Sequence, residues 1–371
     1  MRSLYGMLVA CAIALAGLAL YDKRINGETF ALDPTVTLST ERWKGVLFTA
    51  PGVPEIKTLI AHSGDQQAVE GKCKPLSILW LGNSQLHFIN QYAQGDHVAP
   101  YWLRQAVPCP DTTVPLGVSL PNANLQEHYI LASYVTTRVP IRLIILELCF
   151  DDMREDGLRD EFRDFLDVSD RERLARNPVG RDIVQSADEE WRHVDVGQQN
   201  SGLEGFVQKA VEDRLDHGLA RIWPLWADRE NLRTDLLTDL YYLRNRVLGI
   251  KPTTVRKMIA PRYSRNMKAL GQLLHDAQTN NIRVVAYIAP IRQDFPIPYD
   301  RGEYESWKSG VSDMAKESGA TLINLETLVP PPLWGNYHGD DIDFMHFRGR
   351  GHQLLAKALL PYVELIEQSE L

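Results

Sequence analysis

Five short apolar runs constrain the fold of this chain more than any other feature. They lie at residues 76–81, 116–120, 141–148, 282–288 and 320–325, and their length and composition are typical of strands buried on both faces of a parallel sheet. A helical pattern at 267–277 precedes the fourth run and places Leu270, Leu273 and Leu274 on one face. Strands that alternate with helices predict an α/β fold with a doubly wound, mainly parallel sheet, in which ligands bind at the carboxyl ends of the strands.

The amino terminus has a different character. Residues 4–21 carry no formal charge, and 18 helical residues at about 1.5 Å each span roughly 27 Å, close to the thickness of a bilayer core. We therefore expect residues 1–21 to form a membrane anchor. A cleaved signal peptide is the alternative, although the segment lacks a good small-residue cleavage site and exceeds a usual signal core. Residues 22–74 show no strong period and are expected to be a lead-in to a folded domain at 75–371.

Charge and cysteine content bear on the compartment. The chain has 40 Lys and Arg residues against 48 Asp and Glu residues, a net charge of −8, which argues against a basic nucleic-acid surface. Cys11 lies in the apolar segment and Cys149 at the end of a predicted strand, which leaves Cys73 and Cys109 either to form a disulfide in an oxidising compartment or to stay as free thiols. We expect the folded domain on the periplasmic or extracellular side of the membrane.

A long segment without strand signals separates the third and fourth apolar runs. Residues 151–174 are rich in Asp, Glu and Arg, and residues 227–248 have leucines at helical spacing before Gly249. We expect a helical insertion at about 151–265. Because it follows a strand end, it could cover the active-site edge of the sheet, where Trp223 and Trp226 would either line a cleft or pack against the sheet.

The first candidate for chemistry is Ser84. The apolar run that ends at Leu81 continues into Gly82-Asn83-Ser84-Gln85 and then into a stretch compatible with a helix. A serine in such a turn lies at a helix N-terminus, where backbone N–H groups can stabilise an oxyanion. Serine is also a common helix cap, so the motif alone has two interpretations.

The second candidate lies near the other end of the chain. Asp343 and His346 are three residues apart, follow a proline-rich loop and precede a helix that begins near Gly349. Around a turn, the carboxylate can hold one nitrogen of the imidazole while the other faces a serine from a neighbouring strand end. The three side chains would then be the nucleophile, base and orienting acid of a serine hydrolase.

In these two blocks the chain resembles the SGNH or GDSL hydrolase superfamily. Together with the amino-terminal anchor, it is most similar to the DltD-like branch, whose members take part in acylating cell-envelope polymers. The resemblance covers roughly residues 76–150 and 280–360. It implies that Ser84 is the nucleophile, His346 the general base and Asp343 the residue that orients it.

The resemblance is incomplete at two places. Asn83 and Gln85 replace the Asp and Leu of the standard Gly-Asp-Ser-Leu block, and residues 147–152 replace the usual Gly-x-Asn-Asp block after the third strand. Asn124, which follows the second predicted strand, could donate its amide to an oxyanion together with the Ser84 N–H group. We therefore predict an oxyanion hole from Ser84 and Asn124.

Two other kinds of site are alternatives to this one. A classical α/β-hydrolase expects Gly-x-Ser-x-Gly at the nucleophile, which this chain lacks at Ser84. A metal site is the other rival, since mixed oxygen and nitrogen ligands that could hold zinc or manganese crowd together at His338, Asp340, Asp341, Asp343 and His346. The prediction is a site without metal or cofactor.

Two further residues have alternative interpretations. His87 lies one helical turn after Ser84 and either contacts substrate or packs as an ordinary histidine. Arg154 lies in the charged stretch after the third strand and either binds substrate or belongs to a salt-linked helix start with Asp151.

The sequence thus predicts a serine-dependent acyl-ester hydrolase or O-acyltransferase that acts on a cell-envelope polysaccharide or a teichoic-acid-like polymer. Its expected partners are an acylated donor, the envelope polymer and a membrane-bound O-acyltransferase, with no nucleic acid. The alternative is a non-catalytic scaffold of the same fold that binds an acylated carrier or glycan in an envelope acylation complex.

Overall fold

A six-stranded parallel sheet forms the centre of the structure. The computed structural model describes residues 30–32, 47–49, 76–108, 113–198, 253–336 and 342–370. The strand order across the sheet is β2-β5-β3-β6-β7-β8, and every neighbouring pair is parallel. The strands are β2 (Leu47–Thr49), β5 (Thr113–Ser119), β3 (Leu76–Gly82), β6 (Leu143–Leu148), β7 (Arg283–Ile288) and β8 (Thr321–Asn324). The five apolar runs of the sequence all form strands of this sheet.

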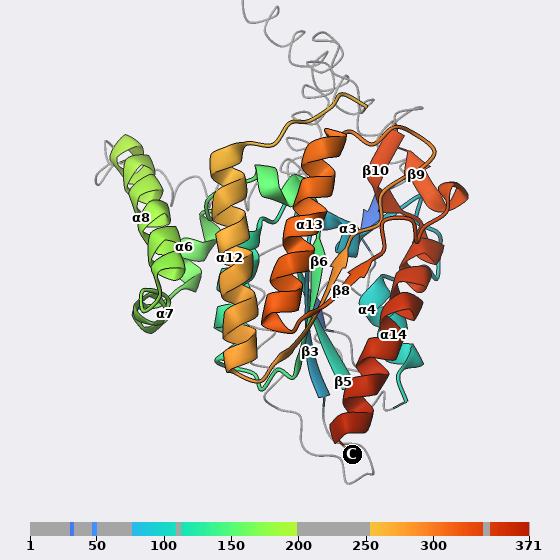
Figure 1. Ribbon diagram of the computed structural model, residues 1–371, viewed down its shortest axis with the longest axis horizontal. Coiled ribbons are helices and arrows are strands. Elements are labelled where there is room, and N and C mark those ends of the chain that lie inside the picture. The colour runs from blue at the N-terminus through green and yellow to red at the C-terminus, as the bar shows by residue number, and fades with distance from the viewer. Residues whose placement is uncertain are drawn as a thin grey trace, which may run out of the picture. The chain divides into compact units, whose positions relative to one another are not determined.

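Helices cover both faces of the sheet (Figure 1). One face packs on α5 (Leu125–Thr136), α12 (Ala260–Thr279) and α13 (Arg301–Ser318), and the other packs on α4 (Ala99–Ala106) and α14 (Gly349–Glu370). Leu79 and Leu81 of β3 point to the first face, whereas Ile78 and Trp80 point to the second. This alternation explains why the strands are apolar throughout, and it makes the sheet doubly wound as predicted.

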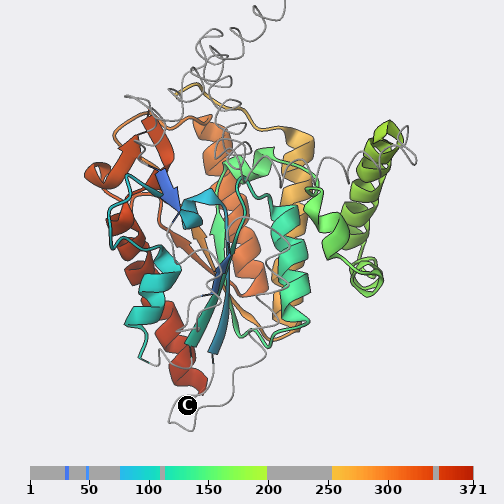
Figure 2. The same ribbon diagram turned by 180° about the vertical axis from the view of Figure 1, so that it is seen from behind.

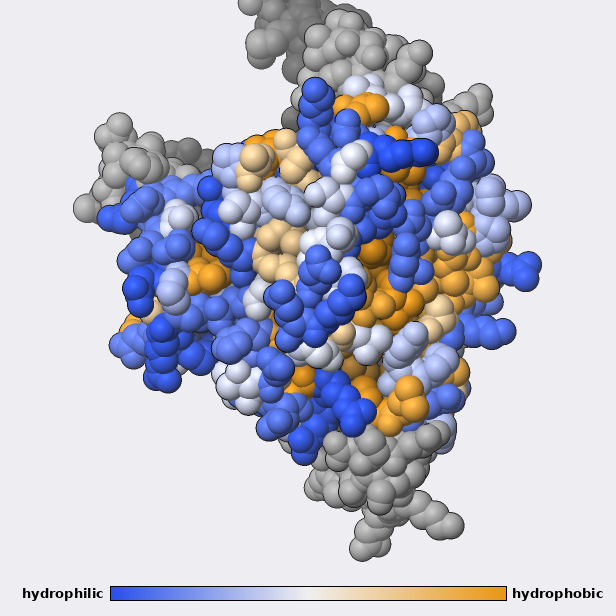
Figure 3. All heavy atoms as spheres, in the orientation of Figure 1, coloured by the Kyte–Doolittle hydropathy of each residue, from blue (hydrophilic) through white to orange (hydrophobic). Residues whose placement is uncertain are grey.

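The helices are amphipathic, which leaves the outside of the molecule polar. In α13 the buried residues Tyr304, Trp307, Val311 and Ala315 recur at helical spacing and face the sheet. The face shown in Figure 3 is accordingly mostly hydrophilic, with smaller hydrophobic areas.

The strand order fixes where a ligand site can form. From β3 the chain passes to β5 on one side and later to β6 on the other, so β3 and β6 are neighbours at the point where the winding reverses. Ligands of open parallel sheets bind beside the carboxyl ends of the strands at such a point. Gly82 ends β3 and Leu148 ends β6, so the residues just after them lie at this edge.

Two small antiparallel sheets differ from expectation. β1 (Phe30–Leu32) pairs with β4 (Phe88–Asn90), and β9 (Trp334–Asn336) pairs with β10 (Ile342–Phe347). The stretch expected to be only a lead-in therefore supplies β1 and also β2, the edge strand of the main sheet. The segment that carries Asp343 and His346 is a strand rather than a simple turn, although its pairing with β9 shifts register.

The segment after β6 is helical where it is described. It contains the 3₁₀ turn η1 (Asp151–Arg154), then α6 (Glu161–Phe165), α7 (Val168–Leu174) and α8 (Pro178–Gln198), all visible in Figure 2. The chain divides into a compact unit of residues 30–191 and 252–371 and a second unit of residues 1–29 and 192–251. The site described below belongs entirely to the first unit.

Several predictions lie outside the described residues. These are the membrane anchor at 1–21 with Cys11, the pair Cys73 and Cys109, the tryptophans Trp223 and Trp226, and His338, Asp340 and Asp341 of the rival metal site. Among the helices that are described, none is both long enough and apolar enough to cross a membrane.

Candidate active site

Ser84 lies in a tight turn between β3 and the short helix α3 (Ser84–His87). Asn83 is the N-cap of α3, and its Oδ1 accepts a hydrogen bond from the Gln85 N–H group at 2.9 Å. Gly82 is required in this turn because a Cβ atom there would overlap Glu147 Oε2 and the side chain of Leu86. The turn therefore presents Ser84 at the carboxyl edge of the sheet, beside the end of β6.

The structure brings Ser84, His346 and Asp343 into one hydrogen-bonded chain. His346 Nε2 lies 3.0 Å from Ser84 Oγ, and His346 Nδ1 lies 3.0 Å from Asp343 Oδ2. The serine and the histidine are 262 positions apart in the sequence. They meet because α3 contacts β10 at this edge of the fold, as the two labels in Figure 1 show.

Asp343 is buried and held by three further donors. Its Oδ1 accepts the N–H groups of Met345 and His346 at 2.9 and 3.0 Å, and its Oδ2 accepts a hydrogen bond from Asn90 Nδ2 at 2.8 Å. Burial alone would raise the pKa of this carboxyl, but the neighbouring His346 and these N–H donors hold it below its ordinary value. Asp343 is thus a fixed negative group directed at the imidazole.

Asn90 was not identified from the sequence. It lies in β4, is fully buried and contacts Asp343 from a position 253 residues away. Gly335 of β9 allows this close approach, since a Cβ atom there would overlap the Asn90 side chain. No local sequence signal marks an asparagine whose partner is so distant.

The imidazole of His346 is also fixed by packing. The Phe88 ring meets it edge to face, with 5.7 Å between the ring centroids. Only 8% of His346 remains exposed. The Nε2 atom is therefore held towards Ser84 rather than free to turn into solvent.

Two buried acids, Glu147 and Asp152, hold the turn through hydrogen bonds with Asn83. Glu147 Oε2 accepts the Asn83 N–H group at 3.0 Å, and Asp152 Oδ1 accepts a hydrogen bond from Asn83 Nδ2 at 3.1 Å. Cys149 connects the two acids, because its N–H group donates to Asp152 and its thiol to Glu147. These residues occupy the place of the expected Gly-x-Asn-Asp block, and Cys149 is a free, buried thiol.

Burial dominates the electrostatics of these two acids. It raises the pKa of Glu147 to about 7, although the hydrogen bonds from Asn83 and Cys149 favour the charged form. Burial, together with the nearby Glu147, also raises the pKa of Asp152 well above its ordinary value. The two acids are thus not both fully ionised at neutral pH. They act on the turn through hydrogen bonds.

The structure places Asn124, the predicted oxyanion donor, at the start of a helix. Asn124 is the N-cap of α5, and its Oδ1 accepts the N–H groups of Gln126 and Glu127 at 2.9 and 3.0 Å. Its Nδ2 donates to the Gly157 carbonyl at 2.9 Å. The amide that we expected to stabilise an oxyanion is therefore committed to a helix cap and a loop. Asparagine is favoured at both kinds of position, and the sequence alone does not separate them.

The Ser84 N–H group remains as a donor. It is the first N–H group of α3 and has no hydrogen-bond partner among the described residues. A free N–H group on the nucleophile's own residue is a usual component of an oxyanion hole.

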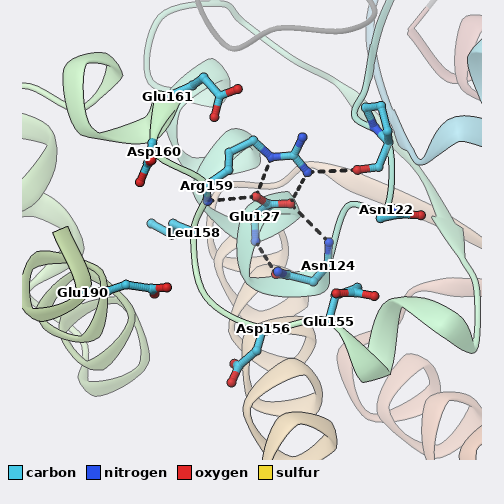
Figure 4. A pocket seen from close by; sticks show the side chains of 11 residues that line it. Asn122, Asn124, Glu127, Glu155, Asp156, Leu158, Arg159, Asp160, Glu161 and Glu190 are labelled. Carbon is cyan, nitrogen blue, oxygen red and sulfur yellow. Dashed lines mark hydrogen bonds and ion pairs between the residues drawn. The ribbon is translucent and has the colours of Figure 1, made fainter. Parts of the chain in front are cut away.

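Asn124 lies in a different hollow, drawn in Figure 4. This hollow has a volume of about 580 Å³ and is lined largely by acidic side chains, with Arg159 held by Glu127 through bonds of 2.7 and 2.9 Å. Neither Ser84, Asp343 nor His346 lines it. Its lining comprises Pro121, Asn122, Asn124, Glu127, Glu155, Asp156, Leu158, Arg159, Asp160, Glu161 and Glu190.

His87 is a packed histidine and not a substrate contact. It is fully buried, and its Nδ1 lies 2.9 Å from Ser119 Oγ at the end of β5. Burial lowers the pKa of His87 to about 3, and the nearby His346 and His352 act in the same direction. His87 is therefore neutral across the physiological range.

Arg154 belongs to the salt-linked helix start that was its structural interpretation. Its Nε donates to the Lys257 carbonyl at 3.1 Å, and its Nη1 lies 3.6 Å from Asp151 Oδ1. Asp151 also accepts a hydrogen bond from the Tyr299 hydroxyl at 2.9 Å. These contacts join η1 to the segments before α12 and α13.

The residues of the rival metal site are only partly described. Within the described ranges there is no group of three or more His, Cys, Asp and Glu side chains that could hold a metal ion. Asp343 and His346, the two described members, are bonded to each other.

Comparisons with known proteins add distant likenesses. No family model matches the sequence, and no curated protein matches it either. Among solved structures, a GDSL-like lipase from Bacteroides thetaiotaomicron aligns with 85% of this chain and 98% of its own, at 10% identity and a TM-score of 0.38. An acetylxylan esterase from Geobacillus stearothermophilus aligns with 79% of this chain and 96% of its own, at 10% identity and a TM-score of 0.37. At such low similarity, function has to be inferred from the geometry of the site.

Proposed function

We propose that this protein is a serine-dependent acyl-ester hydrolase or O-acyltransferase, with Ser84 as nucleophile, His346 as general base and Asp343 as the residue that orients it. The observation that carries the proposal is the continuous set of contacts from Ser84 Oγ to His346 Nε2 and from His346 Nδ1 to Asp343 Oδ2, each 3.0 Å long. A nucleophile bonded to a base that is itself oriented by an acid is the arrangement that activates serine.

The reaction follows from this geometry in two halves. His346 Nε2 takes the proton of Ser84 as Oγ attacks the ester or thioester carbonyl, and the protonated His346 then gives that proton to the leaving alcohol or thiol as its bond to the acyl carbon breaks. The product of this half is an acyl-serine. In the second half, His346 removes a proton from water or from a sugar or polyol hydroxyl, whose oxygen attacks the acyl carbon. The bond from that carbon to Ser84 Oγ then breaks as His346 returns the proton to Oγ, which restores the free serine.

Each neighbour has a defined part in these steps. Asp343 accepts a hydrogen bond from the Nδ1–H group and so keeps Nε2 unprotonated and free to act as the base. The Ser84 N–H group donates to the oxygen that becomes negative during attack. The buried acids Glu147 and Asp152 keep Asn83, and with it the turn, in one conformation.

The substrate and location in this proposal come from the sequence. The apolar run at 4–21 would hold the domain at a membrane, and the resemblance to the DltD-like branch favours a cell-envelope polysaccharide or teichoic-acid-like polymer as acceptor or substrate. We propose that the domain works on the periplasmic or extracellular side, beside a membrane-bound O-acyltransferase that supplies acyl groups. The acceptor decides between hydrolysis and transfer.

A fluorophosphonate probe tests the catalytic part. We expect the full-length protein to be labelled covalently on Ser84 and the Ser84→Ala variant to remain unlabelled. Equal labelling of the two proteins would remove Ser84 from the mechanism. Absence of labelling in the folded wild type would favour the non-catalytic scaffold, which the engagement of Asn124 by a helix cap keeps as the second candidate.

The envelope part needs a separate test in cells. We expect the ester content of envelope glycans, measured by mass spectrometry, to change when Ser84→Ala replaces the wild-type protein. An unchanged ester content, with the variant present at the wild-type level, would contradict action on the envelope and leave an esterase for another substrate.

A further inference from the structure

Gln85 connects the two halves of the site. It follows Ser84 directly, is fully buried, and its Nε2 donates two hydrogen bonds. One goes to the Met345 carbonyl at 2.6 Å, and the other goes to the Pro290 carbonyl at 2.9 Å. Met345 directly precedes His346, so a single amide joins the neighbour of the nucleophile to the neighbour of the base.

The hydrogen bonds of Gln85 connect segments that are far apart in the sequence. Its own backbone N–H group is bonded to the Asn83 cap, which fixes Gln85 to the nucleophile turn. Pro290 follows β7, and Met345 lies in β10, 260 positions from Gln85. The Gln85–Met345 bond and the Ser84–His346 bond both join side chains of α3 to residues of β10.

This arrangement has a cost for stability. Gln85 Oε1 is buried and has no hydrogen-bond partner among the described residues. Leaving a buried acceptor without a donor destabilises the folded state. The Gln85 side chain donates to two carbonyl groups while its own Oε1 lacks a donor among the described residues. Its presence here is therefore not explained by stability alone.

The position of β10 supplies that reason. Its pairing with β9 is irregular between Ile342 and Phe347, the stretch that contains His346, and is in register again at Phe347, which pairs with Trp334. Asp343, on the same strand, accepts the Met345 and His346 N–H groups and is itself held from β4 by Asn90, which among the described residues has no hydrogen bond to Ser84 or its turn. Gln85 is an anchor from outside the strand that also moves with Ser84.

We propose that Gln85 is a positioning residue that sets the distance between His346 Nε2 and Ser84 Oγ by holding the Met345 carbonyl. The inference rests on the proposed function of Ser84 and His346. A misplacement of about 1 Å at a catalytic base can lower a rate about 100-fold. Loss of the Gln85 amide should therefore slow the reaction of Ser84 while the site remains formed.

The test compares Gln85→Met with Gln126→Met in the full-length protein. Methionine has a similar length and volume but cannot donate to the two carbonyls. Gln126 is the matched control, because it is also a buried glutamine with one side-chain hydrogen bond, from Nε2 to Asp156 Oδ1 at 2.9 Å, and it lies in α5. The readouts are the rate of fluorophosphonate labelling, kcat and KM for an activated ester such as p-nitrophenyl acetate, and the thermal unfolding midpoint.

We expect Gln85→Met to be labelled about 10- to 100-fold more slowly than the wild type, with kcat reduced, KM little changed and unfolding similar to that of Gln126→Met. Gln126→Met should be labelled at the wild-type rate. Wild-type labelling of a folded Gln85→Met would overturn the positioning role while leaving the proposed function intact. An equal loss of labelling in both variants, in step with lower stability, would also overturn it, since the effect would then be structural.

If Gln85→Met does not fold, Gln85→Asn gives the same comparison, because its amide is one methylene too short to reach both carbonyls. A failure of the wild type itself to label overturns both the proposed function and this inference. A Ser84-dependent signal in the wild type that Gln85→Asn retains in full overturns the inference alone.

Discussion

At the scale of single residues, Asp343 is the group whose role is most open to direct test. Asp343→Asn keeps the size of the side chain but places an amide N–H group or an uncharged oxygen against His346 Nδ1. The substitution favours the imidazole tautomer that carries its proton on Nε2, which cannot accept the Ser84 proton. We expect the rate of fluorophosphonate labelling at neutral pH to fall about 10³- to 10⁴-fold. A fall of less than about tenfold in a folded variant would contradict the role of Asp343.

The three residues that we propose as catalytic could be identified in the sequence for a reason specific to their type. Serine after a strand and Asp-x-x-His before a helix are recognisable because their chemistry requires those side chains. Asn90, Gln85 and Glu147 were not, because each contacts a partner 64 to 260 positions away. The role of Asn124 as a helix cap was not predicted, because an asparagine that caps a helix has the same sequence context as one that faces a ligand.

At the scale of elements, the junction of β3 and α3 depends on the glycine before Asn83. Gly82→Ala would press a methyl group against Glu147 Oε2 and Leu86. We expect the variant to lose about 1–3 kcal/mol of unfolding free energy and to be labelled more slowly, since the turn that presents Ser84 must move. Urea unfolding measures the first effect and probe labelling the second.

Gly310→Ala is the matched control for that substitution. Gly310 lies inside α13, where an added Cβ atom would meet Met267 and Tyr263 at an ordinary distance of 3.6 Å. Alanine should raise stability here by about 0.5–1 kcal/mol, because it is the better helix former. Equal stability losses in the two variants would show that the space beneath Gly82 is not the cause.

The five main strands and α12 followed from hydrophobic patterns, whereas the short strands did not. β1, β2, β4 and β9 have three residues each. A strand of three residues is too short to show a hydrophobic period, and its partner strand is determined by the rest of the fold. β10 was expected as a turn because Asp343 and His346 needed to face each other. The register shift of this strand, with two N–H groups bonded to Asp343, achieves that inside a strand.

At the scale of the whole molecule, buried histidines should make the fold sensitive to acid. His128 is fully buried with its Nε2 3.3 Å from the Gly82 carbonyl, and burial lowers its pKa to about 4. Its pKa in the unfolded chain is about 6.5. Between these two values the unfolded state binds more protons than the folded state, so unfolding becomes easier as the pH falls.

A substitution isolates this contribution. His128→Gln can still donate to the Gly82 carbonyl but does not titrate. Between pH 7 and pH 5 we expect the variant to lose about 2 kcal/mol less unfolding free energy than the wild type, since each pH unit below 6.5 contributes about 1.4 kcal/mol. Urea unfolding at the two pH values measures the difference. Parallel losses in the two proteins would contradict a neutral, buried His128.

The fold class, by contrast, was set by features that act across the whole chain. Apolar runs buried on both faces, separated by helical segments, leave few alternatives to a doubly wound parallel sheet. The strand order, with β3 and β6 adjacent, then places the ends of those strands at one edge. Composition and periodicity do not encode which loop approaches that edge, so the approach of β10 to α3 could be proposed only from the chemistry of the residues involved.

The proposed mechanism requires a covalent acyl intermediate on Ser84, and that intermediate can be trapped. The full-length protein is mixed with p-nitrophenyl acetate, quenched in acid within the first turnovers and digested for mass spectrometry. We expect one acetyl group on the peptide that contains Ser84 in the wild type and none on that peptide in Ser84→Ala. Release of p-nitrophenol by the wild type at quench times within the first turnover, with no acetyl group on the Ser84 peptide, would contradict this mechanism.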